Sequence, residues 1–216
     1  MKNVRLTQRE KITEAFKRYL PEVFVQEVVE LFISSSVKFK IVAGRKTKLG
    51  DFRAGINGEK HQITINGDLN PYSFLITTLH EFAHLHTYNT FGNRVHPHGE
   101  EWKNAYRKLL LPVIHSGNLP KDIESALTHS LVTTKASSCS DQRLSRVLHA
   151  YDKTMEGIEL LERLPNNATF VLQGKQFVKG PLRRKRFICK EVQSQRSYLV
   201  NALAKVYPVI KNEHEK

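Results

Sequence analysis

LITTLHEFAHLHT, at Leu75–Thr87, is the stretch around which the rest of the chain can be arranged. It contains the pattern H-E-x-x-H, formed by His80, Glu81 and His84. On an α-helix of 3.6 residues per turn, side chains four positions apart lie on the same face. Two imidazoles in this arrangement can bind one divalent metal ion, and the glutamate between them projects beside it. The stretch therefore predicts a helix that carries a metal site.

Length and composition limit the class of protein. The chain has 216 residues, of which 40% are hydrophobic and 25% charged, and such values are typical of a globular protein with a sizeable core. No apolar run approaches the roughly 20 residues of a membrane-spanning helix, and the N-terminus lacks the apolar segment of a secretory signal. Cys139 and Cys189 make neither a disulfide framework nor a four-cysteine zinc site. We therefore expect a cytoplasmic protein without a membrane partner.

The net charge of +13 predicts a polyanionic partner, because each phosphate neutralised by lysine or arginine releases counterions. Residues 165–216 hold 11 Lys and Arg against 3 Asp and Glu, a surplus of 8. Within them, Arg183, Arg184, Lys185 and Arg186 form a continuous basic run beside an aromatic residue. We expect these four to contact DNA or another nucleic acid. The alternative is a solvated strand edge whose charges discourage aggregation.

The segments before the motif predict helices and a small sheet. Helical spacing extends over residues 8–33, and Pro21 marks a kink or a break between two helices. Asn70 suits the N-cap of the central helix, and Pro71 suits its first position. Between these segments, three short runs have the pattern of strands, with an antiparallel sheet as the simplest packing: Val37–Val42, Leu49–Ala54 and Gln62–Asn66.

After Tyr88 the helical pattern gives way to a predicted loop. Helical spacing resumes from Glu100 to Leu111, and one more short helix is expected from Lys121 to His129. Residues 130–140 are small and polar, as in a linker, and Gln142–Asp152 predicts another helix.

From about Pro165 the period changes to two, which predicts a small basic β module of five strands. Gly174-Lys175 fits a two-residue hairpin turn. The expected strands are Thr169–Gln173, Gln176–Lys179, Arg186–Lys190, Tyr198–Val200 and Leu203–Tyr207. We therefore predict an α+β protein in three parts: a helical domain with a small sheet over residues 1–129, a linker and helix over 130–164, and the β module over 165–216.

A catalytic zinc ion takes three protein ligands and keeps a fourth position for water, so a third ligand is expected downstream. The variant H-E-x-x-H-x-x-G-x-x-H is excluded, because Thr90 stands where it requires histidine. His86 would point about 160° away from His84 on a helix, from the 100° step per residue, and His96 precedes a proline in the loop. His98 stands before Gly99, directly ahead of the next helix, and it is the ligand that we predict.

HEFAHLHTY followed by HPHGEEWK resembles the SprT-like family of zinc metalloproteases, whose eukaryotic members include the Spartan DNA–protein crosslink protease. That family carries an H-E-x-x-H helix and, about 14 residues beyond it, an H-G-x-E-[WF] segment whose histidine is the third zinc ligand. The resemblance covers roughly residues 10–112 and includes the upstream LGDFRAG and ITIN runs. It implies a zincin-like core with Zn²⁺ bound by His80, His84 and His98, and with Glu81 as the catalytic residue.

Together, the resemblance and the charge favour a zinc-dependent protease that cleaves proteins on or near DNA. The alternative is a non-proteolytic, transcription-linked factor that associates with nucleic acid and has a structural metal site. Many SprT-like proteins carry a cysteine-rich zinc ribbon after the catalytic domain, but Cys139 and Cys189 are 50 residues apart and belong to no C-x-x-C pair. The basic β segment stands in the place of that ribbon, so the ribbon's role cannot be transferred to it.

Overall fold

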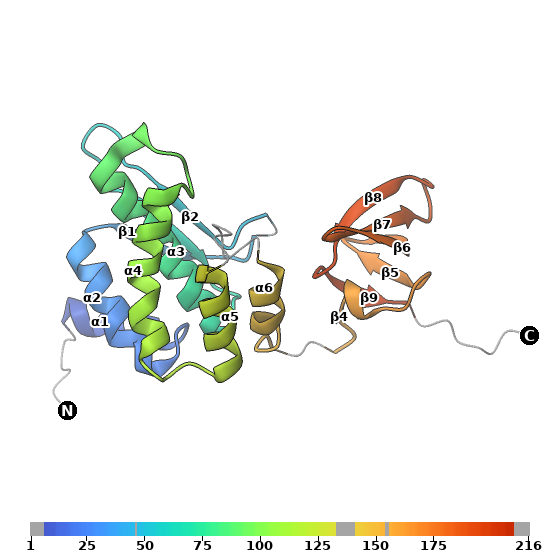
Figure 1. The fold of residues 1–216 in the computed structure, drawn as a ribbon, viewed down its shortest axis with the longest axis horizontal. Helices are drawn as coiled ribbons and strands as arrows, with labels where there is room; N and C mark the ends of the chain where they lie inside the picture. Colours follow the sequence, from blue (N-terminus) through green and yellow to red (C-terminus); the bar gives the residue numbers. More distant parts are fainter. Residues whose placement is uncertain (1–6, 46, 133–140, 154–155, 210–216) are drawn as a thin grey trace, which may run out of the picture. The chain divides into compact units, whose positions relative to one another are not determined.

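The computed structural model describes residues 7–45, 47–132, 141–153 and 156–209. The chain divides into two compact units, Met1–Asp152 and Lys153–Lys216, which Figure 1 shows as a mainly helical unit and a β unit. The first unit contains a three-stranded sheet and the second a six-stranded sheet. The predicted α+β class, with a helical core and a separate β module, is confirmed. Most of the predicted linker, residues 133–140 with Cys139, lies outside the described residues.

The N-terminal helices separate at Pro21, as the sequence predicts. Helix α1 (Gln8–Lys17) begins with a capping box, in which Thr7 and Glu10 satisfy each other's backbone N–H groups. A 3-10 turn, η1 (Glu22–Phe24), follows the proline and leads into α2 (Val25–Ser35). The buried side chains of these helices, among them Phe16, Phe24 and Val29, belong to the core that surrounds the motif helix.

The three-stranded sheet is mixed, so the antiparallel arrangement expected from the sequence is wrong. Strands β1 (Lys38–Val42), β2 (Gly50–Arg53) and β3 (Gln62–Asn66) lie in the order β1-β3-β2. β3 pairs parallel with β1 and antiparallel with β2. Strand β3 is the most buried of the three, with Ile63 and Ile65 fully buried. Burial therefore places β3 in the centre and leaves β2 at an edge.

The motif lies on α3 (Pro71–Phe91), the longest helix among the described residues. Its first turn is capped as predicted, because the Asn70 side chain accepts a hydrogen bond from the Ser73 N–H and Pro71 occupies the first position. The helix packs on α4, β2 and β3 and is buried on nearly all sides from Ser73 to Leu85. It ends three residues beyond Tyr88, where the sequence predicts a loop.

Three further helices complete the first unit: α4 (Glu100–His115), α5 (Lys121–Val132) and α6 (Gln142–His149). Residues 130–132 of the predicted linker are therefore helical. Helix α6 belongs to the same core, since Leu144 is fully buried. The Asn70 side chain also donates to Leu148 O (2.9 Å) and Asp152 Oδ1 (2.7 Å), so the last turn of α6 and the segment after it hold the start of α3. No helix among the described segments is long and apolar enough to cross a membrane.

The second unit is an antiparallel sheet of six strands rather than five, in the order β4-β9-β5-β6-β7-β8. The additional strand, β4, has only two residues and gives no periodic signal. The hairpin turn between β5 and β6 lies one residue before the predicted Gly174-Lys175. Gln173 and Gly174, both with positive φ, form this turn, and Leu172 pairs with Lys175. The strands are β4 (Glu159–Leu160), β5 (Thr169–Leu172), β6 (Lys175–Arg183), β7 (Arg186–Glu191), β8 (Ser197–Asn201) and β9 (Lys205–Pro208).

The core of this unit contains Phe170, Cys189 and Val206, which are fully buried. It also contains a lysine: Lys179 is 2% exposed and donates to Leu164 O (2.5 Å) and Glu162 O (3.2 Å). The ammonium group lies 4.1 Å from the centre of the Phe187 ring. Lys179 therefore joins the 3-10 turn η4 (Leu161–Arg163) to the sheet, and its charge faces inward rather than toward a ligand.

Candidate metal centre

Three imidazoles meet between α3 and the start of α4. His80 and His84 lie one turn apart on α3, and His98 lies just before Gly99, the N-cap residue of α4. The Nε2 atoms of His80 and His84 are 3.2 Å apart, and the Nε2 atom of His98 is 3.1 Å from each of them. The structure thus brings together the three residues that the sequence indicates, and they form a cluster that could hold a metal ion.

This cluster fits a metal ion of the size of zinc. For tetrahedral zinc with Zn–N distances of about 2.0–2.1 Å, ligand nitrogens lie roughly 3.3 Å apart, close to the separations found here. Burial lowers the pKa of His80 to about 3 and that of His84 to about 4, and it also lowers the pKa of His98. The three rings are therefore neutral at pH 7, which is the form that binds metal.

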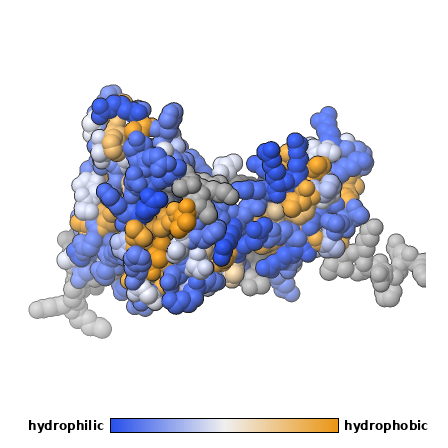
Figure 2. Space-filling model, viewed as in Figure 1, coloured by the Kyte–Doolittle hydropathy of each residue, from blue (hydrophilic) through white to orange (hydrophobic). Residues whose placement is uncertain are grey.

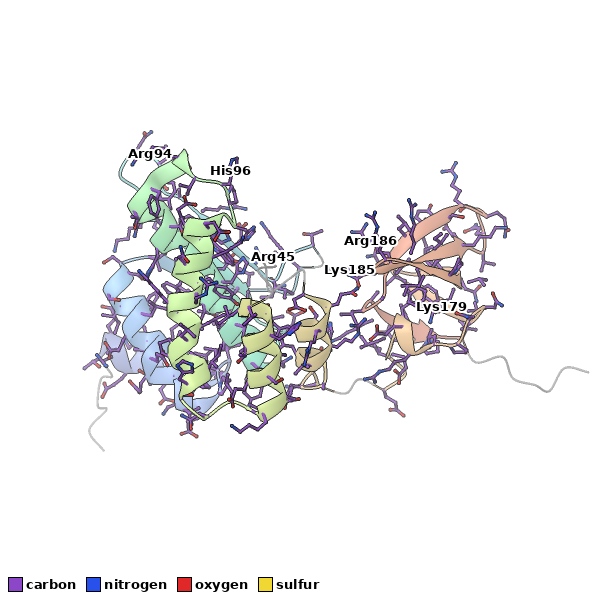
Figure 3. All side chains as sticks on the ribbon, in the orientation of Figure 1. Arg45, Arg94, His96, Lys179, Lys185 and Arg186 are labelled. Atoms are coloured by element: carbon purple, nitrogen blue, oxygen red, sulfur yellow. The ribbon has the colours of Figure 1, made fainter. Side chains whose placement is uncertain are left out.

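Two other histidines near the motif stay outside the cluster. His86 is on α3 but exposed, in keeping with the turn of the helix between it and His84. His96 is exposed in the loop between α3 and α4, and Figure 3 shows it projecting from that loop. The sequence arguments that set both residues aside agree with this placement.

Glu81 is buried beside the imidazoles, with 6% of its surface exposed. Burial raises the pKa of this carboxyl to about 8, and the nearby Asp51 carboxylate adds to the shift, while a hydrogen bond from the Phe52 N–H opposes it. A cation bound to the neighbouring histidines would lower this pKa again, because it favours the charged form. Glu81 is thus a buried carboxyl group with a raised pKa next to the three histidines.

Comparison with protein families adds an independent observation. The family model described as SprT-like matches residues 12–129, more than half of the chain. The chain belongs to the SprT-like family. Comparison with curated proteins and with solved structures gives no match. Membership suggests a function of the metallopeptidase type, and the matched region contains all three imidazoles and Glu81.

The four basic residues predicted to bind nucleic acid lie outside the matched region of this SprT-like protein, at the turn between β6 and β7. Arg183 pairs with Arg186 across the two strands, and Arg184, with φ of +57°, forms the turn with Lys185. All four are exposed, and Figure 3 shows Lys185 and Arg186 next to each other at the turn. They form one basic cluster, which we call the basic turn.

Two aromatic residues of the SprT-like centre have closer contacts than the sequence suggests. Trp102 is 1% exposed, and the centre of its ring lies 4.6 Å from that of His80, 5.3 Å from that of His84 and 4.7 Å from that of His98. The Phe52 ring lies nearly parallel to the His84 ring, with the ring centres 6.4 Å apart and an angle of 9° between the ring planes. The position of Trp102, four residues after His98, is the only sequence signal for its role; nothing singles out Phe52.

His98 has a backbone conformation that favours glycine, with φ of +62°. In the metal-free protein we expect His98→Gly to be about 1 kcal/mol more stable than His98→Ala, because a Cβ is strained in the left-handed region. Thermal unfolding of the two metal-free variants measures this difference. At His96, where φ is not positive, glycine should give no such advantage over alanine. Equal stability of the two His98 variants would contradict the assigned strain.

Proposed function

We propose that this protein is a zinc-dependent peptidase, with His80, His84 and His98 as the metal ligands and Glu81 as the general base. One observation carries the proposal: a buried carboxylate accompanies three neutral imidazoles whose Nε2 atoms lie within 3.2 Å of one another. Three ligands leave one tetrahedral position for water or substrate, which is the arrangement of catalytic zinc sites.

When bound, zinc supplies Lewis-acid chemistry that activates a water molecule and polarises the peptide carbonyl. Glu81 accepts the proton of the attacking water and passes it to the leaving amine, so that each peptide bond cleaved consumes one water. The imidazoles hold the ion, and Trp102 packs against all three rings and limits their movement. The burial of Glu81 keeps competing solvent away from its carboxylate.

A purely structural metal site is the alternative, and the ligand set argues against it. Structural zinc fills all four positions with cysteine or histidine. Among the described residues the cluster has three members, all of them histidines. Cys189 is fully buried in the core of the second unit, away from any such role. A buried glutamate next to the ligands has a use in catalysis and none in a closed site.

Removal and restoration of the metal tests the proposal. Wild-type protein should cleave an unfolded protein substrate such as casein, lose the activity when a chelator removes zinc, and regain it when one equivalent of zinc is returned. The cleavage products are followed by gel electrophoresis and mass spectrometry. Cleavage that persists in protein shown to be free of metal would refute the proposed mechanism.

We further propose that the basic turn binds nucleic acid, so that the peptidase acts on proteins on or near DNA. The four exposed positive charges of the turn supply phosphate contacts without specifying sequence. The same sheet presents exposed apolar side chains, since Leu199 is 48% and Tyr207 52% exposed. Figure 2 shows such hydrophobic patches among hydrophilic residues on the visible face of this unit. We infer that the charges of the basic turn contact phosphates and that the exposed apolar side chains contact bases.

Salt dependence tests this partner. Replacing Arg183 and Arg186 by glutamine should weaken DNA binding and reduce the slope of log affinity against log salt by about 1.4–1.8, since each neutralised phosphate contributes about 0.7–0.9. The matched control removes the same charge from Lys175 and Arg196, near the other end of the β6–β7 hairpin, and should leave the slope nearly unchanged. Equal slopes for both double variants, or no DNA retention at low salt, would contradict the proposal.

A further inference from the structure

The carboxylate of Glu81 fills the space where Gly50 lacks a side chain. A methyl group on Gly50 would lie 2.5 Å from Glu81 Oε1, and 2.8 Å from both Glu81 Cγ and Thr77 Cγ2. These separations are far below van der Waals contact between carbon and its neighbours. Thr77 and Glu81 are one turn apart on α3, so both face the same point on strand β2. Strand β2 and helix α3 approach each other closely only because residue 50 is glycine.

The backbone at Gly50 does not itself require glycine. Its φ lies outside the positive region, and the residue pairs with Ile65 in an ordinary antiparallel register. Glycine within a strand is destabilising relative to alanine and often marks a close approach of another group. An alanine at this position would collide with the Glu81 side chain, most closely with its carboxylate oxygen, and with the Thr77 methyl group.

The same strand also holds the carboxylate by a hydrogen bond. The backbone N–H of Phe52 donates to Glu81, two residues after the glycine. Strand β2 is an edge strand that is held on the sheet by its antiparallel pairing with β3, and the Asn66 side chain donates a hydrogen bond to Lys48 O just before it (2.9 Å). The ring of Phe52 lies parallel to the His84 ring, so one short segment contacts both the acid–base group and a metal ligand.

We propose that β2 positions the general base: Gly50 provides the recess for the Glu81 carboxylate, and the Phe52 N–H fixes its orientation. Gly50 and Phe52 are thus positioning residues that act through Glu81, and this role rests on the function proposed above. A displacement of about 1 Å in a catalytic group can cost about 10²-fold in rate. An added methyl group at residue 50 forces a displacement of that order.

The kinetic test is the variant Gly50→Ala. It should lower kcat about 100-fold while KM, zinc content and thermal stability stay close to those of the wild type, because the histidines are not touched. Gly44→Ala is the matched control, since a methyl group there would also meet a carboxylate, that of Asp68, away from the metal cluster. In a Glu81→Gln background Gly50→Ala should cause no further loss of rate. A Gly50→Ala enzyme with wild-type kcat would overturn the inference and leave the proposed function standing.

A second measurement does not depend on activity. In the NMR spectrum of zinc-loaded full-length protein, the Phe52 amide resonance should shift in both Gly50→Ala and Glu81→Ala, because each removes the hydrogen bond to the carboxylate. It should stay in place in Gly44→Ala. An unchanged Phe52 amide in both site variants would refute the positioning role even if the protein had no peptidase activity at all. Absence of activity in the wild type, with these shifts present, would refute the proposed function alone.

Discussion

A Glu81→Gln variant is expected to bind zinc as tightly as the wild type and to cleave peptide bonds about 10²–10⁴ times more slowly, the usual contribution of a positioned acid–base group. The amide has the shape of the carboxylate and can still accept the hydrogen bond from the Phe52 N–H. It cannot, however, take a proton from the attacking water. The structure of the site and the metal ligands should therefore stay intact while the proton transfer is lost.

Cleavage rate and zinc content, measured on the same preparation, decide this prediction. Glu100→Gln is the control, because Glu100 is an exposed residue at the start of α4 that is paired with Lys103. It should retain both zinc and activity. If Glu81→Gln cleaves substrate at the wild-type rate, the glutamate between the two histidines has no catalytic role and the mechanism is wrong.

The second large effect concerns the third ligand. His98→Ala should weaken zinc binding by more than the 10–100-fold that loss of an outer-shell partner costs, because it removes one of three direct ligands. His96→Ala should leave zinc affinity within a factor of two or so of the wild type, since His96 is exposed in the loop and does not belong to the cluster. Competition with a chromogenic zinc chelator measures both affinities.

The two variants lie two residues apart in the same loop, so a general disturbance of the loop would affect both alike. A loss of zinc confined to His98→Ala supports the ligand assignment. Equal losses in the two variants, or a loss confined to His96→Ala, would show that the cluster seen in the structure is not the zinc site.

The helices of the first unit could be predicted from local signals. Pro21 interrupts the N-terminal helix, and Asn70 with Pro71 begins the motif helix, because caps and prolines act within one turn. His98 could be placed by its position before Gly99, the N-cap of α4, although the positive φ that this position requires could not. Signals of this kind need only neighbouring residues.

The features that escaped prediction depend on distant parts of the chain. The central position of β3 follows from burial between two other strands, and alternation within a strand does not reveal its neighbours. β4 is too short for any period. The role of Gly50 requires knowledge that Glu81, 31 residues later, occupies its empty side. A glycine in LGDF reads from the sequence alone only as a turn or a weak strand residue.

The most direct test of the central claim, that this SprT-like protein is a zinc peptidase built on three histidines and a glutamate, is one experiment on three proteins. Zinc per chain and the cleavage rate of an unfolded protein are measured together for wild type, Glu81→Gln and His84→Ala. We predict zinc with cleavage in the first, zinc without cleavage in the second, and neither in the third. Cleavage by Glu81→Gln, or zinc and cleavage retained in His84→Ala, would contradict the account.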